Sequence, residues 1–256
     1  MAKQNKSDVR EDVRNAIKDL YPGNTVQIDF TPDDSYLAKI YDDLRGKLSG
    51  IKKAAVMYEH DESSTLLPAD DGGDDGDPKL WDSDDEPPMN TEDFHCSYFT
   101  LFIGLTGKDA TFETEGPTEE EDGTLENVPG IGHCGCTVVI SWLAPYALIR
   151  LASMENYEDG TYTTPEIDPD VFTMDFRPAD LEVHYREFMG DEVIERMKAL
   201  REKIVHILEG FGIAMIGTEE AEKPVPSLRA GEGVLIGPKD TGHKITVKDA
   251  LFFRAL

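Results

Sequence analysis

The longest apolar run in the chain, at positions 134–154, predicts the centre of the fold. Within it, residues 137–143 and 146–151 are rich in β-branched and aromatic side chains, which favour strands. Ala144 and Pro145 lie between these two stretches and are typical of a tight turn. We therefore expect two paired central strands here.

Helical periodicity predicts three amphipathic helices. The first is capped by Ser7 and ends at Tyr21. The second is capped by Asp33 or Asp34, and the third covers residues 191–209. Their apolar stripes, which we expect to pack on a sheet, are Val9, Val13, Ile17 and Leu20; Leu37, Ile40, Tyr41, Leu44 and Leu48; and Val193, Ile194, Met197, Leu200, Ile204, Ile207 and Leu208.

Shorter strand patterns complete the predicted sheet. They lie at positions 26–30, 54–58, 94–105, 110–113, 171–176, 213–216 and 234–236. The turn-forming residues 106–108 predict a hairpin between the third and fourth of these strands. A final helix or turn at 247–253 carries Leu251, Phe252 and Phe253, so we expect the C-terminal end to pack into the core.

These elements predict the fold class. The central strands are joined by turns and loops rather than by crossover helices, which favours antiparallel pairing. We expect an α+β fold in which a mainly antiparallel sheet of four or more strands is covered by amphipathic helices. The length of 256 residues and the 39% of apolar residues suit one domain, 1–256.

The formal net charge of -27 is concentrated in two segments. Residues 59–93 contain fourteen acidic residues and one basic residue, and residues 115–128 contain six acidic residues and no basic one. Both segments are rich in Gly or Pro, and we expect them to be long acidic loops inserted into the domain. Their charge repels nucleic acid and anionic membranes, so it excludes these partners and favours a basic protein.

The two acidic segments also supply the predicted partner-binding residues. Trp81 follows Leu80 and is surrounded by carboxylates, a pattern typical of a short motif for a basic, hydrophobic partner groove. We expect the contacts to come from Asp74, Asp75, Leu80, Trp81, Asp84 and Asp85 in the first segment and from Glu119, Glu120 and Glu121 in the second. A solvated loop with no binding role is the alternative interpretation.

Calcium is one cofactor that the first segment brings into question. Asp71, Asp75, Gly76 and Asp82 follow the spacing of an EF-hand loop. Gly73 stands where the second ligand should be, and no helical pattern flanks the segment. We therefore predict no specific calcium loop.

The cysteines and two histidines form the only grouping of soft metal ligands. Cys134 and Cys136 would point to the same side of a strand, next to His133. With His95 or Cys96 from another strand, they could hold zinc. The Cys-x-Cys spacing departs from the usual Cys-x-x-Cys, and buried cysteines often act as small apolar residues. We predict no cofactor, with zinc or calcium as the alternative.

The sequence contains no catalytic motif. A cysteine nucleophile with His95 or His133 as its base would also need an orienting acid and an oxyanion hole, and the pattern indicates neither. Gly130, Gly132 and Gly135 fit neither the dinucleotide fingerprint nor the P-loop, and predict a turn. We expect a protein that is not an enzyme.

Three functional hypotheses remain. The favoured one is a non-catalytic cytoplasmic binding protein that neutralises a basic protein partner, as an immunity protein or antitoxin-like inhibitor does. The alternatives are a Cys/His metal-binding protein or enzyme, and a structural scaffold protein with solubilising acidic loops. The cytoplasm is expected because the chain has no signal-peptide pattern, no run near the ~18 apolar residues of a membrane helix, and only three cysteines. The sequence does not indicate an oligomeric state.

Overall fold

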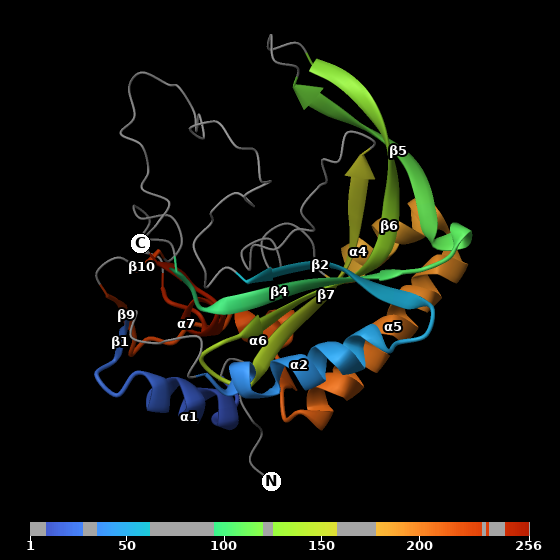
Figure 1. Cartoon of the computed structure of the whole chain (residues 1–256). Helices are drawn as coiled ribbons and strands as arrows, with labels where there is room; N and C mark the ends of the chain where they lie inside the picture. The colour runs from blue at the N-terminus through green and yellow to red at the C-terminus, as the bar shows by residue number, and fades with distance from the viewer. Residues whose placement is uncertain are drawn as a thin grey trace, which may run out of the picture.

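One long strand, β6 (Leu125–Ser141), is the centre of the fold in the computed structural model of this chain (Figure 1). The structure describes residues 9–27, 35–61, 95–119, 125–157, 178–231, 234–235 and 244–255. β6 pairs antiparallel with β4 and β5 on one edge and with β7 on the other. β2 pairs antiparallel with β4, and β8 pairs parallel with β7, which completes a six-stranded sheet.

The strands of this sheet are β2 (Ala54–Asp61), β4 (Tyr98–Leu105), β5 (Thr111–Glu119), β6, β7 (Tyr146–Tyr157) and β8 (Ala214–Met215). Short strands form two smaller sheets: β1 (Thr25–Val26) with β9 (Arg229–Ala230), and β10 (Val234–Leu235) with β11 (Arg254–Ala255) and β3 (His95–Cys96). The helices are α1 (Glu11–Leu20), α2 (Tyr36–Ser49), the 3₁₀ turn η3 (Lys108–Ala110), α4 (Pro178–Met189), α5 (Asp191–Gly210), α6 (Thr218–Ala221) and α7 (Val247–Leu251).

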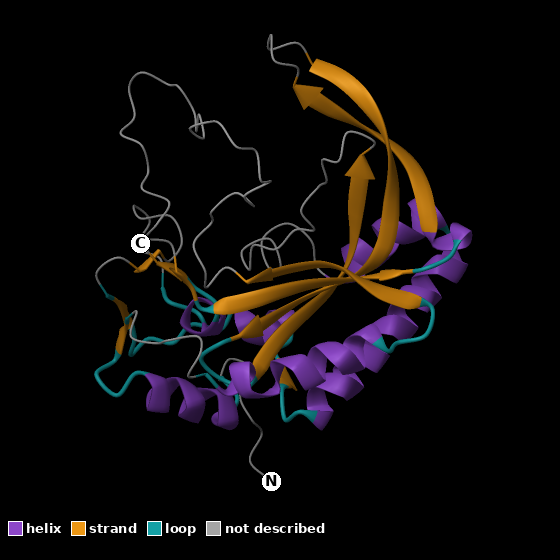
Figure 2. Cartoon of the chain, in the orientation of Figure 1, coloured by secondary structure: helices purple, strands orange, loops and turns teal. Residues whose placement is uncertain are grey.

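Helices α2, α4 and α5 cover one face of the sheet (Figure 2). The buried residues of α5 recur at helical spacing, so they form one apolar stripe against the strands. The sheet side chains that meet this stripe come from alternate positions of each strand: Phe99, Leu101 and Ile103 of β4, Cys134, Cys136, Val138 and Ile140 of β6, and Ala147 and Leu151 of β7.

The opposite face of the sheet has three zones. At the end of β6 near Ser141, it packs against α1, α6 and α7 through Tyr98, Val139 and Leu148. In the middle, Phe102, Ala152 and Met154 form a small buried cluster. Beyond that cluster, β5 and the first half of β6 extend past β4 and curve away from α4 and α5 (Figure 1).

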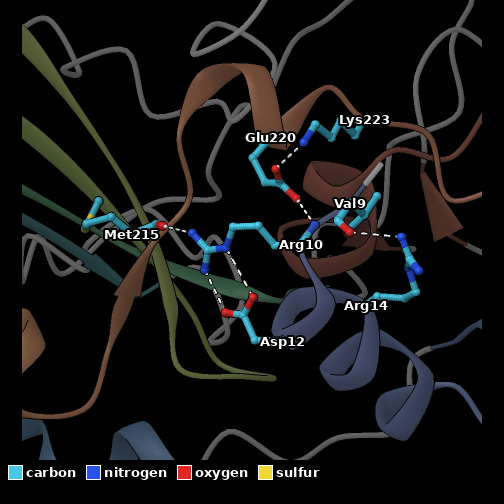
Figure 3. Close-up of polar contacts among 7 residues, drawn as sticks. All are labelled: Val9, Arg10, Asp12, Arg14, Met215, Glu220 and Lys223. Carbon is cyan, nitrogen blue, oxygen red and sulfur yellow. Dashed lines mark hydrogen bonds and ion pairs between the residues drawn. The ribbon is translucent and has the colours of Figure 1, made fainter. Parts of the chain in front are cut away.

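Polar contacts of Arg10 attach α1 to the C-terminal part of the chain (Figure 3). Its backbone N–H donates to Glu220 Oε1 at 2.7 Å, and its guanidinium donates to the Met215 carbonyl at 3.1 Å. Lys223 binds the other Glu220 oxygen at 2.6 Å. The guanidinium also hydrogen-bonds Asp12, which lowers the pKa of that carboxyl. Each of these charged groups has a partner, so the cluster has a structural role.

Hydrogen bonds from two serines hold the C-terminal end of the chain against the sheet. Phe253 N–H donates to Ser97 Oγ at 2.7 Å, and Ser97 N–H donates to the Phe253 carbonyl at 2.9 Å. Ser141 Oγ donates to the Leu251 carbonyl at 2.7 Å. Leu251, Phe252 and Phe253 are buried, which confirms the predicted packing of this end.

The predicted fold class is confirmed: the sheet is mainly antiparallel, and amphipathic helices cover it. The two central strands and the long helix α5 also lie where the sequence predicts them. Two helix starts differ. α1 follows Arg10, and α2 follows Ser35, whose hydroxyl accepts a hydrogen bond from Ala38 N–H at 3.1 Å. The predicted caps, Ser7, Asp33 and Asp34, lie outside the described residues, as does the predicted strand at 171–176.

The predicted hairpin between residues 94–105 and 110–113 is wrong. β5 pairs with β6, and η3 shifts the chain so that it continues along the same edge of β6 instead of reversing. The loop expected at 115–128 is wrong for its two ends, because Glu115–Glu119 belong to β5 and Leu125–Val128 belong to β6. The turn predicted at Gly130, Gly132 and Gly135 is also wrong, since all three lie inside β6.

None of the described helices is long and apolar enough to cross a membrane.

Truncating the α5 stripe should destabilise the protein strongly. Ile204 is fully buried against the sheet, so Ile204→Ala should lower the free energy of unfolding by about 2–5 kcal/mol. Lys203→Ala, one residue away on the exposed side, should change it by less than about 0.5 kcal/mol. Urea denaturation of both variants measures the difference, and equal effects would contradict the assignment of the buried face.

The C-terminal attachment gives a second stability prediction. Ser97→Ala leaves the buried Phe253 N–H without its acceptor, which should cost about 1–3 kcal/mol of unfolding free energy. Ser49→Ala, at an exposed serine, serves as the control and should cost less than about 0.5 kcal/mol. If thermal unfolding of the two variants is the same, Ser97 does not hold this end in place.

Candidate functional site

An open groove of about 860 Å³ lies where β5, the first half of β6 and the end of β7 run side by side. Most of its side chains occupy the alternate positions that face away from α5. Its lining residues are Glu113, Thr114, Glu115, Pro129, Gly130, Ile131, His133, Asn156 and Tyr157.

The other side of this part of the sheet is filled by its own aromatic rings. Phe112 packs on Gly132, and Tyr157 packs on Gly116 and Gly130, so a methyl group at any of these glycines would overlap a ring. This close approach explains why three glycines are tolerated within strands.

Polar groups on that filled side are paired with one another. Glu155 Oε2 accepts hydrogen bonds from Thr114 Oγ1 at 3.0 Å and from Tyr157 OH at 2.6 Å. These contacts join β5 to β7 across β6 and help to fix the shape of the groove.

The groove face combines negative charge with an apolar contact. Glu113 and Glu115 are both exposed, and they face the same side because they are two residues apart in a strand. Ile131 lies directly opposite Glu113 and is 53% exposed, one of two large apolar side chains with high exposure in the described part of the chain. An exposed isoleucine beside two carboxylates suits a partner segment that is both cationic and partly apolar.

His133 lies deeper in the groove, opposite Thr111 of β5. Burial lowers the pKa of its imidazole, which favours the neutral form. Its Nδ1 atom is buried and has no hydrogen-bond partner. An unsatisfied polar atom of this kind is costly, and a ligand group with the complementary hydrogen-bonding role would relieve the cost.

Almost all of the predicted acidic-loop residues lie outside the part of the chain that the structure describes. Glu119 is described only as the last residue of β5. The other predicted contacts lie outside the described residues: Asp74, Asp75, Leu80, Trp81, Asp84, Asp85, Glu120 and Glu121. The groove residues Glu113, Glu115 and Ile131 were missed, although the Glu-x-Glu spacing at 113–115 indicates two carboxylates on one face of a strand.

The cysteines and His133 do not form one ligand set. Cys134 and Cys136 belong to the core beneath α5, as their spacing predicted, whereas His133 faces the groove on the opposite side of the sheet. Cys96 lies in β3, in a different sheet and beyond Tyr98, whereas Cys136 pairs near the other end of β4. His133 therefore shares no ligand site with Cys134 and Cys136.

The buried thiols are also poor nucleophiles. Burial raises the pKa of Cys134 to about 11 and that of Cys136 to about 12, so both are protonated near neutral pH. Of the two bases considered for them, His133 is on the opposite face of the sheet, and the side chain of His95 lies outside what the structure describes. Among the described residues, no group of three or more His, Cys, Asp or Glu side chains could hold a metal ion. The calcium pattern at 71–82 lies outside them.

Comparisons of the chain with models of protein families, with curated proteins and with solved structures found no significant match.

Proposed function

We propose that this protein is a non-catalytic cytoplasmic binding protein that neutralises a basic protein partner, in the manner of an immunity protein or an antitoxin-like inhibitor. The observation that carries the proposal is the groove beside β5, where the exposed Ile131 lies opposite Glu113 and diagonal to Glu115. A cationic surface of the partner would lie against the carboxylates, and an apolar side chain would cover Ile131.

The overall charge supports the same proposal. A net charge of -27 attracts a basic protein over distances of about one Debye length, near 8–10 Å in physiological salt, and speeds its association. The predicted contacts in segments 59–93 and 115–128 would add to this attraction. Charge brings the partner in, and the groove gives it a defined place to bind.

The cysteines support a reducing compartment. Cys134 and Cys136 are free and buried in the core, where they pack as small apolar groups. Proteins of oxidising compartments more often use cysteines in disulfides. A cytoplasmic inhibitor agrees with this usage.

Binding through the groove predicts a specific loss in a charge-neutral variant. The double variant Glu113→Gln with Glu115→Gln should bind the partner about 2-fold to 30-fold more weakly, because two exposed ion pairs of ~0.2–1 kcal/mol each are lost. The control is Glu202→Gln with Glu209→Gln, which removes the same charge from exposed positions of α5. The measurement is a pull-down at low and then high salt from cells that make the protein, with mass spectrometry of the eluate.

The expected result is a basic protein that high salt releases, that the control retains and that the groove variant loses. Equal retention by the groove variant and the control would contradict binding at the groove. An eluate without any basic protein would contradict the proposed function and favour the scaffold alternative.

A further inference from the structure

The outer edge of β5 adjoins the groove and has no partner among the described strands. β4 and β5 occupy the same edge of β6 in succession: β4 pairs with Gly135–Ser141, and β5 pairs with Leu125–His133. β2 then covers the outer edge of β4. No strand in the described part of the chain continues that row past β5.

Two hydrogen bonds determine which backbone groups of β5 point outward. Trp142 N–H donates to the Ser97 carbonyl at 2.8 Å, toward β4, and Ile216 N–H donates to the Ala147 carbonyl at 2.9 Å, away from β6. In an antiparallel ladder, successive residues direct their N–H and C=O groups to alternate sides. Since Ala147 is opposite Ile140, the even-numbered residues of β6 face β4 and β5.

This alternation extends into β5 because the β6 register is continuous from Ser141 to Leu125. Phe112, Thr114 and Gly116 lie opposite even-numbered β6 residues and therefore direct their backbone groups toward β6. Glu113 and Glu115 direct theirs outward. Each offers one N–H donor and one C=O acceptor at the open edge.

The positions of two prolines agree with this assignment. Pro117 has no N–H, and its place in the alternation directs the missing donor outward, where no ladder bond is lost. Pro129 lies opposite Glu115 and directs its nitrogen away from β5, at a position where β7 has already ended. If either proline were moved by one residue along its strand, its missing N–H would remove a hydrogen bond between β5 and β6.

The same two residues carry the groove's carboxylates. Alternate side chains of a strand repeat every ~7 Å, so an added strand would match the spacing of Glu113 and Glu115. Residues directly opposite each other across two strands share a face, and opposite charges there attract. Two copies of this chain paired through β5 in register would instead bring like charges together, which disfavours self-association at this edge.

Resting on the proposed function, we propose that the β5 edge binds an extended segment of the basic partner by strand addition, with basic side chains at alternate positions (basic-x-basic). The backbone of the segment pairs with the N–H and C=O groups of Glu113 and Glu115. Its two basic side chains lie opposite these carboxylates, on the face of the sheet that holds the groove.

Synthetic peptides test the spacing while holding the charge constant. The alternating peptide is Thr-Lys-Thr-Lys-Thr-Lys-Thr, and its isomer of identical composition is Thr-Thr-Lys-Lys-Lys-Thr-Thr. A third peptide has the alternating sequence with the lysine amides N-methylated, which removes donors that the edge needs. Fluorescence anisotropy with the full chain should show that the alternating peptide binds about tenfold more tightly than either of the other two, which corresponds to ~1.4 kcal/mol.

The variant Glu113→Gln with Glu115→Gln separates the two levels of the proposal. One outcome is that all three peptides bind equally, that Glu113→Gln with Glu115→Gln abolishes this binding, and that Glu202→Gln with Glu209→Gln retains it. This result would overturn strand addition and leave a groove that binds basic peptides through charge alone. If the unmodified chain, the groove variant and the α5 control bind the alternating peptide equally, or if none of the three binds it, both strand addition and the proposed use of the groove are overturned.

Discussion

Pairing along β6 is the constraint on which the rest of the structure depends. This one strand pairs with β4, β5 and β7, and its alternate side chains fill the core beneath α5 on one face. Cys134 lies between the part of β6 that pairs with β4 and the part that pairs with β5. On the β4 side of this point, helices α2, α4 and α5 cover the sheet; on the β5 side, the sheet extends beyond these helices. The extent of the core and the place of the groove both follow from this change of partner.

Among the described residues, the extended half of the sheet is packed on one side, and the groove lies on the other. Phe112 and Tyr157 pack on glycines of β5 and β6, and Glu155 accepts hydrogen bonds from the hydroxyl groups of Thr114 and Tyr157. The opposite side keeps Glu113, Glu115 and Ile131 exposed. Exposed carboxylates on a loop would have no fixed spacing, but on a strand they are held at a fixed spacing beside backbone groups that no described strand pairs with. That combination favours recognition of an extended, basic segment.

The sequence predicted the parts of the fold that depend on local pattern. The stripe of α5 and the apolar strands around Val138 and Leu148 are confirmed, because helical spacing identifies the long helix and the β-branched and aromatic residues of the two short apolar runs favour strands. Strand partners depend on the chain path, so the hairpin predicted through residues 106–108 was wrong. Composition was misleading at Gly130 and Gly132, which suggest a turn but instead make room for the rings of Tyr157 and Phe112 in neighbouring strands. The groove was missed because the acidic composition of residues 115–128 predicted a loop, whereas the two ends of this segment belong to β5 and β6.

Amide hydrogen exchange of the free protein, followed by NMR at each residue of β5, tests the central claim most directly. The account predicts alternating protection: slow exchange at Phe112, Thr114 and Gly116, whose N–H groups face β6, and fast exchange at Glu113 and Glu115, whose N–H groups face outward. Protection of Glu113 and Glu115 equal to that of their neighbours would contradict it, because the edge would then be covered already and closed to an incoming strand.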